Sequence, residues 1–369
     1  MTFDLAIIGG GPAGTAAAIT AGRSGARVLL LERGRFPRQK VCGEFISPEG
    51  TALLEALGAE DLIRHAPRVA HARIFGGAAV AEATLSPAAS SISRYELDHA
   101  LWRLAGQAGA DCREQAEVRD INGSGPFHLV TLAGAFTARA AINASGRWSN
   151  LRRRRLAHRP REKWVGWKAH FREPALARSV DLYFFAEGYC GVQPLGKGCV
   201  NACAMVRAGS ADSIAEVLAL HRGLRERSLE WEQVSETMAT SPLVFATPDA
   251  EEGGVLFAGD AAGFIDPFVG DGISLALRSG VMAASALGEV WAGKTSVAEA
   301  AGLYRRQYER ELRPLFRNAG WLRQLMSVPR ALHRPVMTLM QMPRVTRFLF
   351  GRTRMSVMPI ETADDPLVG

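Results

Sequence analysis

The first part of the chain alternates between short apolar runs and stretches of small residues. Residues 3–8 (FDLAII) form an apolar run of the kind that a buried parallel strand uses. Residues 15–24 are rich in alanine and favour a helix, and residues 27–31 (RVLLL) form a second apolar run that ends at Glu32. This order predicts a β–α–β unit within about 30 residues.

The pattern of apolar and polar residues also predicts the remaining helices and strands. Helices are expected over residues 51–65, 96–108, 211–225 and 272–290, and mainly helical structure is expected from residue 296 onward. Strands are expected within residues 69–86, in a small antiparallel sheet over 117–121, 127–131 and 136–142, in a second sheet over 163–171, 180–185, 190–194 and 199–206, and at 255–258. The chain therefore has an α/β pattern with two groups of strands.

A glycine-rich turn joins the first predicted strand to the first helix. Gly9, Gly11 and Gly14 have the GxGxxG spacing of a dinucleotide-binding turn, in which glycines allow a tight turn, a close approach of pyrophosphate and close packing of helix on strand. Pro12 suits the first helical turn, whose free N–H groups can face phosphates. Glu32 lies at the end of the second strand, where its carboxylate can accept ribose hydroxyls and would repel a 2′-phosphate.

A second motif lies far along the chain. Residues 255–263 (VLFAGDAAG) form a strand that ends at Gly259 and Asp260, and a carboxylate at a strand end can bind a sugar-alcohol hydroxyl. Residues 266–273 (DPFVGDGI) then lead into a helix whose N-terminus can stabilise negative charge on a reduced flavin. The two motifs together favour FAD over a nicotinamide dinucleotide as the resident cofactor.

Composition and charge exclude several classes of protein. The 369 residues are 47% apolar and 22% charged, which is typical of globular proteins and unlike disordered, collagen-like or disulfide-stapled chains. The five scattered cysteines lack metal-ligand spacing, so we expect free thiols in a reducing cytoplasm and no metal site. We expect no secretory signal, no transmembrane helix and no nucleic-acid module. The oligomeric state stays open.

The motifs resemble a known superfamily of flavoproteins. Residues 259–280 (GDAAGFIDPFVGDGISLALRSG) look like the second FAD motif of geranylgeranyl-reductase-like and aromatic-hydroxylase-like FAD-dependent oxidoreductases. Residues 37–44 (PRQKVCGE) resemble the PRxKxCG segment of the reductase branch, and Arg94 with Leu97 resembles the arginine motif before an FAD-domain helix. Residues 143–146 (NASG) stand where the family has a turn near the flavin pyrophosphate.

The resemblance implies a Rossmann-like FAD-binding domain of the glutathione-reductase or p-hydroxybenzoate-hydroxylase type. We expect this domain to be discontinuous and interleaved with a β-sheet substrate domain, and to be followed by a helical C-terminal region. The predicted FAD-binding domain comprises residues 1–68, 91–158 and 246–295, the substrate domain comprises 69–90 and 159–245, and the C-terminal region comprises 296–369.

The resemblance also implies the cofactor site. Because only one GxGxxG is present, we expect NAD(P)H to visit transiently as reductant and to have no Rossmann domain of its own. The predicted cofactor-binding residues are Gly9, Gly11, Pro12, Ala13, Gly14, Glu32, Arg33, Arg38, Cys42, Arg94, Val118, Gly259, Asp260, Gly270, Gly272 and Ile273.

Three branches of flavin chemistry compete for this chain. Prenyl reductases carry a YxWxFP-like segment, whereas residues 189–194 here read YCGVQP. Halogenases share the stretch matched by residues 43–48 (GEFISP) but also carry WxWxIP, whereas residues 164–169 read WVGWKA. We therefore expect monooxygenation of an apolar aromatic or polyketide-like molecule, with isoprenoid alkene reduction as the first alternative. A halogenase and a non-catalytic flavin-binding protein are further alternatives.

Three residues are candidates for catalysis. Cys42 is expected above the flavin ring, where its thiol can contact substrate or relay a proton, with Arg38 and Lys40 nearby to stabilise a thiolate. A small buried residue beside a glycine turn is the alternative. Glu44 can act as acid or base, although a loop carboxylate is more often paired, and Tyr189 can orient substrate or simply pack in the core.

Positive charge is concentrated near the C-terminus. Net charge is +7, and residues 302–355 hold twelve arginines and two glutamates, interleaved with apolar residues from Trp321 onward. This pattern is compatible with peripheral contact at the inner face of a membrane, with an acyl carrier, or with a cap on the substrate cavity. Residues 152–155 (RRRR) suit an NADP phosphate, an acyl carrier or a solvated face.

Overall fold

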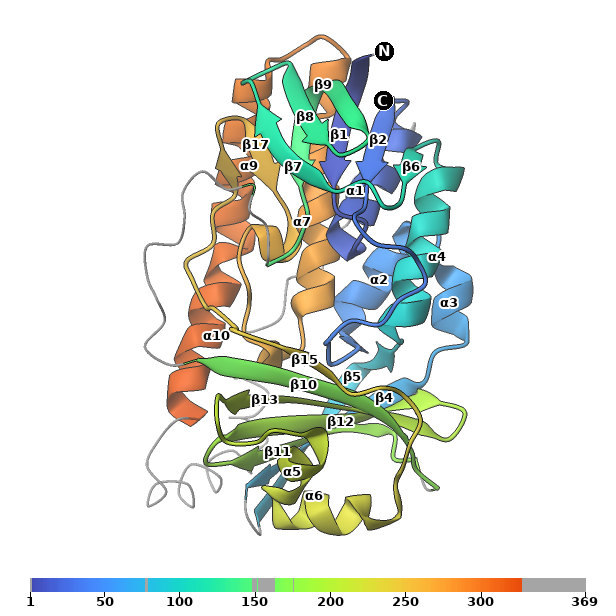
Figure 1. Ribbon diagram of the computed structural model, residues 1–369, viewed down its shortest axis with the longest axis vertical. Coiled ribbons are helices and arrows are strands. Elements are labelled where there is room, and N and C mark those ends of the chain that lie inside the picture. Colours follow the sequence, from blue (N-terminus) through green and yellow to red (C-terminus); the bar gives the residue numbers. More distant parts are fainter. Residues whose placement is uncertain (1, 77–78, 148–150, 152–162, 175, 327–369) are drawn as a thin grey trace.

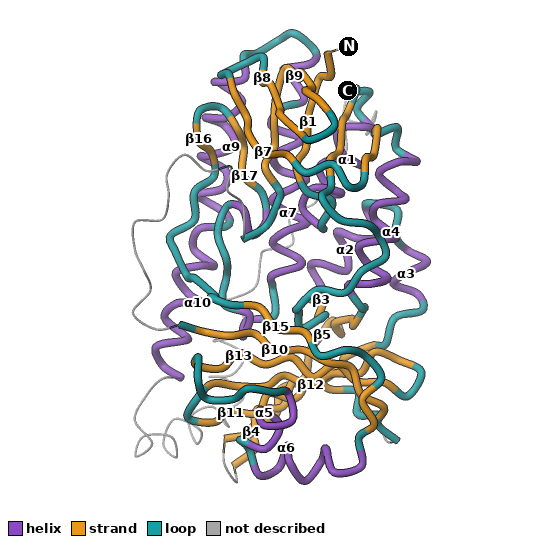
Figure 2. Tube along the Cα trace, in the orientation of Figure 1, coloured by secondary structure: helices purple, strands orange, loops and turns teal. Residues whose placement is uncertain are grey.

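The computed structural model describes residues 2–76, 79–147, 151, 163–174 and 176–326, with side chains described to residue 321. Two β-sheets lie one above the other along the long axis of the molecule (Figure 1). Helices surround the first sheet, and the second sheet lies beneath them. The long loop that follows the second strand runs from the first sheet toward the second (Figure 2).

The first sheet has eight strands and is parallel at its centre. The order is β16 (Glu251–Glu252), β17 (Val255–Phe257), β9 (Gly134–Asn143), β1 (Thr2–Ile8), β2 (Val28–Leu31) and β6 (Asp111–Arg113), with β7 (Val118–Asn122) and β8 (Phe127–Thr131) added through β9. In register, Leu5 stands opposite Val28 and Ala140. The strands predicted over 117–142 are antiparallel, as expected, but they do not form a separate sheet, because β9 also pairs in parallel with β1.

Helices pack closely against this sheet. They are α1 (Pro12–Arg23), α2 (Pro48–Ala56), α3 (Glu60–Arg64), α4 (Arg94–Gln107), α7 (Gly272–Ala286), α8 (Gly288–Trp291), α9 (Val297–Glu311) and α10 (Arg313–Met326). Helices α1 and α7 touch directly, because a Cβ at Gly280 would overlap the carbonyl oxygen of Ala13. Among the described residues, one helical stretch, Gly272–Trp291, has the length and hydropathy of a membrane span, and 72% of its most apolar window is buried inside the protein.

The second sheet has nine strands. The order is β14 (Glu232–Gln233), β10 (Trp164–Arg172), β13 (Cys199–Arg207), β12 (Gly188–Gly196), β11 (Ser179–Phe185), β4 (Arg68–Gly76), β5 (Ala79–Ser91) and β3 (Phe45–Ile46), and β15 (Met238–Thr240) also pairs with β10. Alternate residues face opposite sides of a strand. On β10, Ala169 and Phe171 therefore join a core beneath α5 (Ile214–Ala219) and α6 (Arg222–Arg227), while Lys168 and His170 face the first sheet.

Two predicted helices are each broken in the structure. The helix expected over 51–65 ends after Ala56, because Gly58 has a φ of +86°, and α3 follows as a separate turn. The helix expected over 211–225 divides into α5 and α6, because His221 adopts an extended conformation and accepts a hydrogen bond from the Leu224 N–H (3.3 Å) to cap α6.

Some short elements were not predicted from the sequence. Strands of two or three residues, such as β3 and β14, are too short to show a period, and they form because a longer neighbour offers hydrogen bonds. The 3₁₀ turns η1 (Ser228–Glu230), η2 (Gly259–Ala261) and η3 (Pro267–Val269) were not predicted for the same reason. The helical C-terminal region is confirmed for α9 and α10, and residues 327–369 lie outside the described residues.

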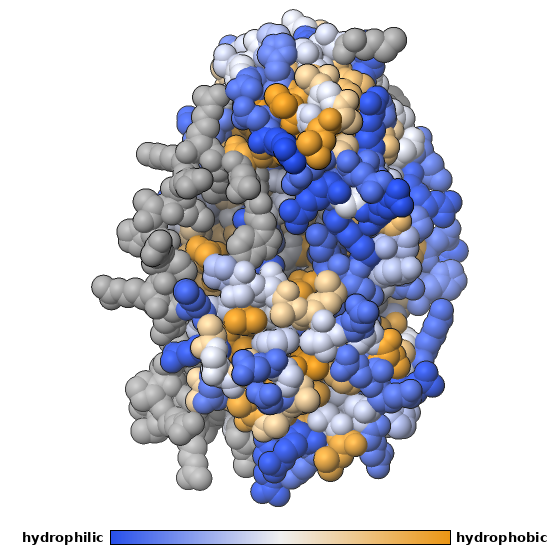
Figure 3. All heavy atoms as spheres, viewed as in Figure 1, coloured by the Kyte–Doolittle hydropathy of each residue, from blue (hydrophilic) through white to orange (hydrophobic). Residues whose placement is uncertain are grey.

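Hydrophilic and apolar residues are unevenly distributed on the side of the molecule shown in Figure 3. Hydrophilic residues predominate over the upper right, around the helices of the first sheet. Apolar residues occur in small groups near the top and over the lower half, where the second sheet lies.

Candidate active site

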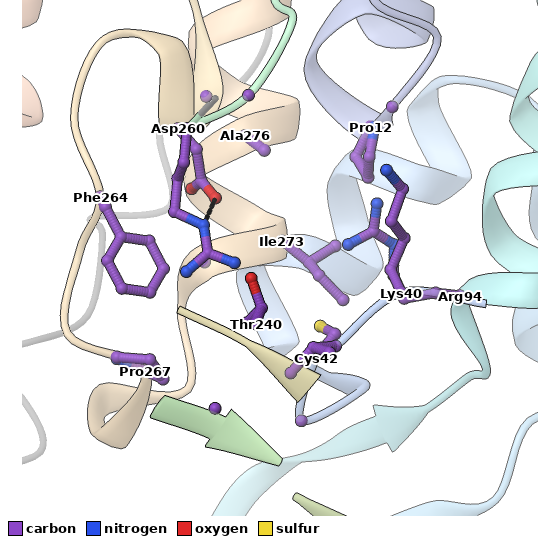
Figure 4. Close-up of a pocket in the computed structure, with 18 of the residues that line it drawn as sticks. Pro12, Lys40, Cys42, Arg94, Thr240, Asp260, Phe264, Pro267, Ile273 and Ala276 are labelled. Atoms are coloured by element: carbon purple, nitrogen blue, oxygen red, sulfur yellow. Dashed lines mark ion pairs between the residues drawn. The ribbon is translucent and has the colours of Figure 1, made fainter. Parts of the chain in front are cut away.

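A cavity of about 820 Å³ lies between the two sheets. This volume is within the range of cofactor and ligand pockets. It is lined by the ends of β1 and β2, the loop after β2, the segment around η2 and η3, and the upper face of the second sheet. Segments more than 200 residues apart in sequence thus meet at one place, as the labelled Pro12 and Asp260 show (Figure 4).

Nearly all of the predicted site residues line this cavity. The ones that do are Gly9, Gly11, Pro12, Ala13, Glu32, Arg33, Arg38, Cys42, Glu44, Arg94, Val118, Tyr189, Gly259, Asp260, Gly270, Gly272 and Ile273. Gly14 lies behind the wall, where a Cβ would overlap the carbonyl oxygen of Gly9, so its role is to bring α1 close to β1.

The first glycine motif leaves an open cradle at the start of α1. Gly9 has a φ of +104°, a conformation that favours glycine. Gly11 precedes α1 with no side-chain cap, so the first N–H groups of the helix stay available. A Cβ at Gly11 would approach nothing closer than the Arg94 side chain, at 3.9 Å. This space and these donors fit a pyrophosphate.

The carboxylate of Glu32 is fixed beside the cradle by hydrogen bonds and an ion pair. Its Oε2 accepts from the Gly10 N–H (2.9 Å), and its Oε1 accepts from the Gly34 N–H (2.8 Å) and pairs with Arg38 (2.7 Å). Burial raises the pKa of this carboxyl, but the Gly34 hydrogen bond and the Arg38 charge outweigh burial, so the net pKa is lowered. The carboxylate is therefore ionised and can accept the hydroxyls of a ribose.

Three cations surround the start of α1. Lys40 and Arg94 lie beside Pro12 (Figure 4), and Arg38 lines the same wall. Arg94 is oriented by Asp98, which accepts two hydrogen bonds of 2.7 Å. Burial, together with the charges of Arg38 and Arg94, lowers the pKa of Lys40 to about 8. A bound diphosphate would offset this repulsion.

Lys40 was not among the cofactor residues assigned from sequence, although its motif was recognised. The signal that would have found it is the accumulation of Arg33, Arg38 and Lys40 directly after Glu32, since three positive charges in one loop repel one another unless an anion lies between them.

The opposite wall carries a second ion pair. Arg147 Nε lies 3.7 Å from Asp260 Oδ2, the pair dashed in Figure 4, and its guanidinium stacks over Phe264 at 4.4 Å. Burial raises the pKa of Asp260 and lowers that of Arg147. Arg147 Nη1 is buried and has no hydrogen-bond partner among the described residues. Sequence analysis missed Arg147, and its position directly after the turn at 143–146 was the available signal.

The second motif supplies the start of α7. The Asp266 side chain accepts from the Phe268 N–H (3.1 Å) and so shapes the turn η3, and Gly270 ends that turn with a φ of +71°. Helix α7 then begins at Gly272 with no side-chain cap. Its free N–H groups and positive dipole end can stabilise negative charge on a flavin ring.

The part of the cavity over the second sheet is largely apolar. Its lining includes Ala72, Leu85, Val180, Leu182, Met205, Leu243, Phe264 and Phe268. Tyr189 belongs to this wall, with its ring 5.9 Å from that of Phe268 and 5.6 Å from that of Phe184. Burial raises the pKa of Tyr189 well above its usual value, so its hydroxyl stays protonated.

Cys42 lies where the two parts of the cavity meet. Its thiol points into the cavity, near Ile273 and Thr240 (Figure 4). The sulfur accepts a hydrogen bond from the Glu44 N–H (3.4 Å). Glu44 itself is fully buried, and its carboxylate is bound by Lys168 and His170. The structure therefore brings Cys42 to the site but occupies Glu44 with other partners.

These features fit one elongated cofactor. A cradle with free helix N–H groups, an ionised carboxylate, a second carboxylate at a strand end and a second helix N-terminus follow one another along one cavity. Their chemistry matches the pyrophosphate, ribose, ribityl chain and flavin ring of FAD. The residues present thus fit FAD.

Comparison with known proteins agrees with this geometry. Residues 2–317 match the family model described as an FAD binding domain. The chain belongs to this family. It is an FAD-dependent oxidoreductase with a fold of the p-hydroxybenzoate-hydroxylase and halogenase type, as the sequence predicted.

Relatives of the FAD-dependent oxidoreductase carry different activities. The menaquinone reductase of Mycolicibacterium smegmatis is 29% identical over 309 residues, which cover 76% of this chain and 75% of that one. The digeranylgeranylglycerophospholipid reductase 2 of Methanopyrus kandleri is 26% identical, over 86% and 85% of the two chains. The flavin-dependent brominase Bmp2 has the same fold, with a TM-score of 0.79, 20% identity and coverage of 96% and 93%.

Proposed function

We propose that this flavoprotein saturates an isolated carbon–carbon double bond in a lipophilic, isoprenoid-like molecule, with NAD(P)H as the source of electrons. The observation that carries the proposal is the thiol of Cys42, which points into the cavity between the cofactor cradle and the apolar wall. Two relatives named as reductases, one of menaquinone and one of a geranylgeranyl lipid, support it. Alkene reduction is thus favoured over monooxygenation.

Saturation of an alkene needs one hydride and one proton, added to neighbouring carbons. Gly11, Glu32 and Asp260 would hold FAD, which would supply the hydride after reduction by NAD(P)H. Cys42 supplies the proton to the other carbon and regains one from solvent. The apolar wall formed by residues such as Leu182, Met205 and Phe268 holds the substrate chain and excludes water, and Tyr189 contributes a protonated hydroxyl to that wall.

The mass of the product tests the proposal. The purified, FAD-loaded protein is incubated with NADPH or NADH and a polyprenylated quinone, with and without oxygen. We expect a gain of two hydrogens that does not require oxygen. A product heavier by one oxygen, formed only in air, would overturn the proposal in favour of monooxygenation, and a halogenated product would favour the third branch. A flavin that no nicotinamide reduces would indicate a non-catalytic role.

The thiol is tested separately by the variant Cys42→Ser. We expect turnover to fall at least about 100-fold while the absorbance spectrum of bound FAD stays unchanged, because general acid catalysis contributes roughly 10²–10⁴ in rate. Cys112→Ser is the matched control, since Cys112 lies on β6 and does not line the cavity. Full activity in Cys42→Ser would show that the proton comes from elsewhere.

A further inference from the structure

The loop that carries Cys42 is fastened to the second sheet by its backbone. Asn201, on β13, donates two hydrogen bonds from Nδ2, one to the carbonyl oxygen of Cys42 (3.0 Å) and one to that of Gly43 (2.9 Å). Asn201 is fully buried. One side chain thus holds the two peptide groups next to the thiol.

The buried ammonium group of Lys168 forms hydrogen bonds with both ends of the same loop. Lys168, on β10, is 1% exposed, and each of its three N–H donors has an acceptor. Nζ donates to Gln39 Oε1 (2.9 Å), to the carbonyl oxygen of Lys40 (3.0 Å) and to Glu44 Oε1 (2.5 Å). The loop therefore closes around a single charge that belongs to the second sheet.

Glu44 completes the attachment from the side of the loop. Its Oε1 also accepts from the N–H of Arg94, the first residue of α4 (2.7 Å), and its Oε2 pairs with Nε2 of His170 (2.8 Å). Burial raises the pKa of this carboxyl, but the hydrogen bond from His170 and the charge of Lys168 outweigh burial, so the net pKa is lowered. Glu44 stays ionised and has both oxygens occupied, so it is poorly suited to transfer a proton to a substrate.

This arrangement is costly as a means of holding two parts of a protein together. Buried ion pairs lose hydration, and apolar residues of similar size often stabilise a fold as well or better. Glu44 also has a φ of +61°, a conformation that residues other than glycine rarely adopt. Charged groups differ from apolar groups in that their hydrogen bonds are directional, so each bond fixes the position and orientation of its partner.

We propose that Glu44, Lys168, His170 and Asn201 form a loop clamp that fixes the thiol of Cys42 in the cavity. They are positioning residues, because they touch the loop that carries the thiol and act through it. The link to catalysis rests on the proposed function, in which the thiol serves alkene reduction. The positioning itself does not depend on which reaction occurs.

The clamp is tested at His170 with a pair of variants. In His170→Leu the pair of Lys168 and Glu44 remains, so no uncompensated charge is buried, but the donor to Glu44 Oε2 is lost. In His170→Gln an amide N–H can replace the imidazole donor. Hydrogen–deuterium exchange of peptides covering residues 38–46 is measured on the FAD-free and FAD-loaded proteins. We expect exchange at least about tenfold faster in His170→Leu and within about threefold of wild type in His170→Gln.

Two further measurements separate positioning from general weakening of the fold. In His170→Leu we expect kcat to fall at least tenfold, with KM and the dissociation constant of FAD changed less than threefold, and we expect His170→Gln to restore kcat. Arg172→Gln is the matched control. Arg172 lies two residues further along β10, and both Arg172 and its ion-pair partner Glu232 are exposed. Asn201→Leu, which removes no charge, should reproduce the faster exchange at residues 38–46.

Distinct results overturn the clamp and the proposed function. Unchanged exchange at residues 38–46 in both His170→Leu and Asn201→Leu would overturn the clamp, as would equal losses in His170→Leu and His170→Gln. An oxygenated product from the wild-type protein would overturn alkene reduction and leave the exchange result valid.

Discussion

At the scale of single residues, the FAD-free site brings several positive charges close together. Lys40 shows this most clearly, because burial and the neighbouring Arg38 and Arg94 lower the pKa of its ammonium from 10.5 to about 8. In the FAD-free protein this shift destabilises the folded state at neutral pH, and stability rises as pH increases from about 8 to 10.5, where the unfolded chain holds the extra proton. A diphosphate in the cradle would favour the charged form.

Above about pH 8, FAD binding should therefore be accompanied by the uptake of a proton at Lys40. We expect the dissociation constant of FAD to be flat below about pH 7.5 and to rise above about pH 8, by at most about tenfold per pH unit. Titration of flavin fluorescence between about pH 7 and about pH 9 measures this. Lys40→Met should weaken binding at pH 7 and remove the pH dependence. Arg35→Met, which changes an exposed cation of the same loop, should keep it, and an unchanged slope in Lys40→Met would contradict the assignment.

At the scale of elements, two glycines of one motif have different tasks. A Cβ at Gly11 would project into the open cradle, whereas a Cβ at Gly14 would overlap the carbonyl oxygen of Gly9. The first glycine makes room for a ligand, and the second makes room for the packing of α1 on β1.

Alanine substitutions should separate these tasks. We expect Gly11→Ala to raise the dissociation constant of FAD at least tenfold with little change in the stability of the FAD-free protein. We expect Gly14→Ala to lower the free energy of unfolding by roughly 1–3 kcal/mol, because overpacking forces the backbone apart. Urea denaturation and FAD titration of both variants measure the two effects. Equal losses of stability in both would show that the cradle is not open at Gly11.

At the scale of the whole molecule, positive charge is concentrated toward the C-terminal end of the sequence. Residues 302–355 hold twelve arginines and two glutamates, while the rest of the chain is slightly acidic. The apolar helix Gly272–Trp291 has 72% of its most apolar window buried inside the protein. We propose that the protein works in the cytoplasm and visits the inner face of the membrane to collect its substrate.

Vesicle binding tests this location. We expect the full chain to sediment with vesicles that contain phosphatidylglycerol at low salt, to be released by about 0.5 M NaCl, and not to bind pure phosphatidylcholine, because screening weakens surface attraction. Replacing Arg330, Arg334, Arg344 and Arg347 with glutamine should abolish binding. Equal binding to both kinds of vesicle would show that charge is not the cause.

The amount of structure that the sequence predicted depended on the range of the interactions. The β–α–β unit at residues 2–31 was predictable, because apolar period, glycine spacing and strand ends are all local features. The breaks at Gly58 and His221 were not, since they arise from a single backbone conformation and a single cap within otherwise helical patterns.

The two FAD-binding motifs were predictable from local sequence, because each motif is a short segment whose spacing already dictates its local shape. The roles of the residues between the motifs depend on contacts between segments that are far apart in the sequence. Glu44 has the same carboxylate in any loop, yet its partners Lys168 and His170 lie 124 and 126 residues away and were invisible to any local pattern. Packing of the two sheets brought them within hydrogen-bond distance, and that contact separates a residue that positions a thiol from one that transfers a proton.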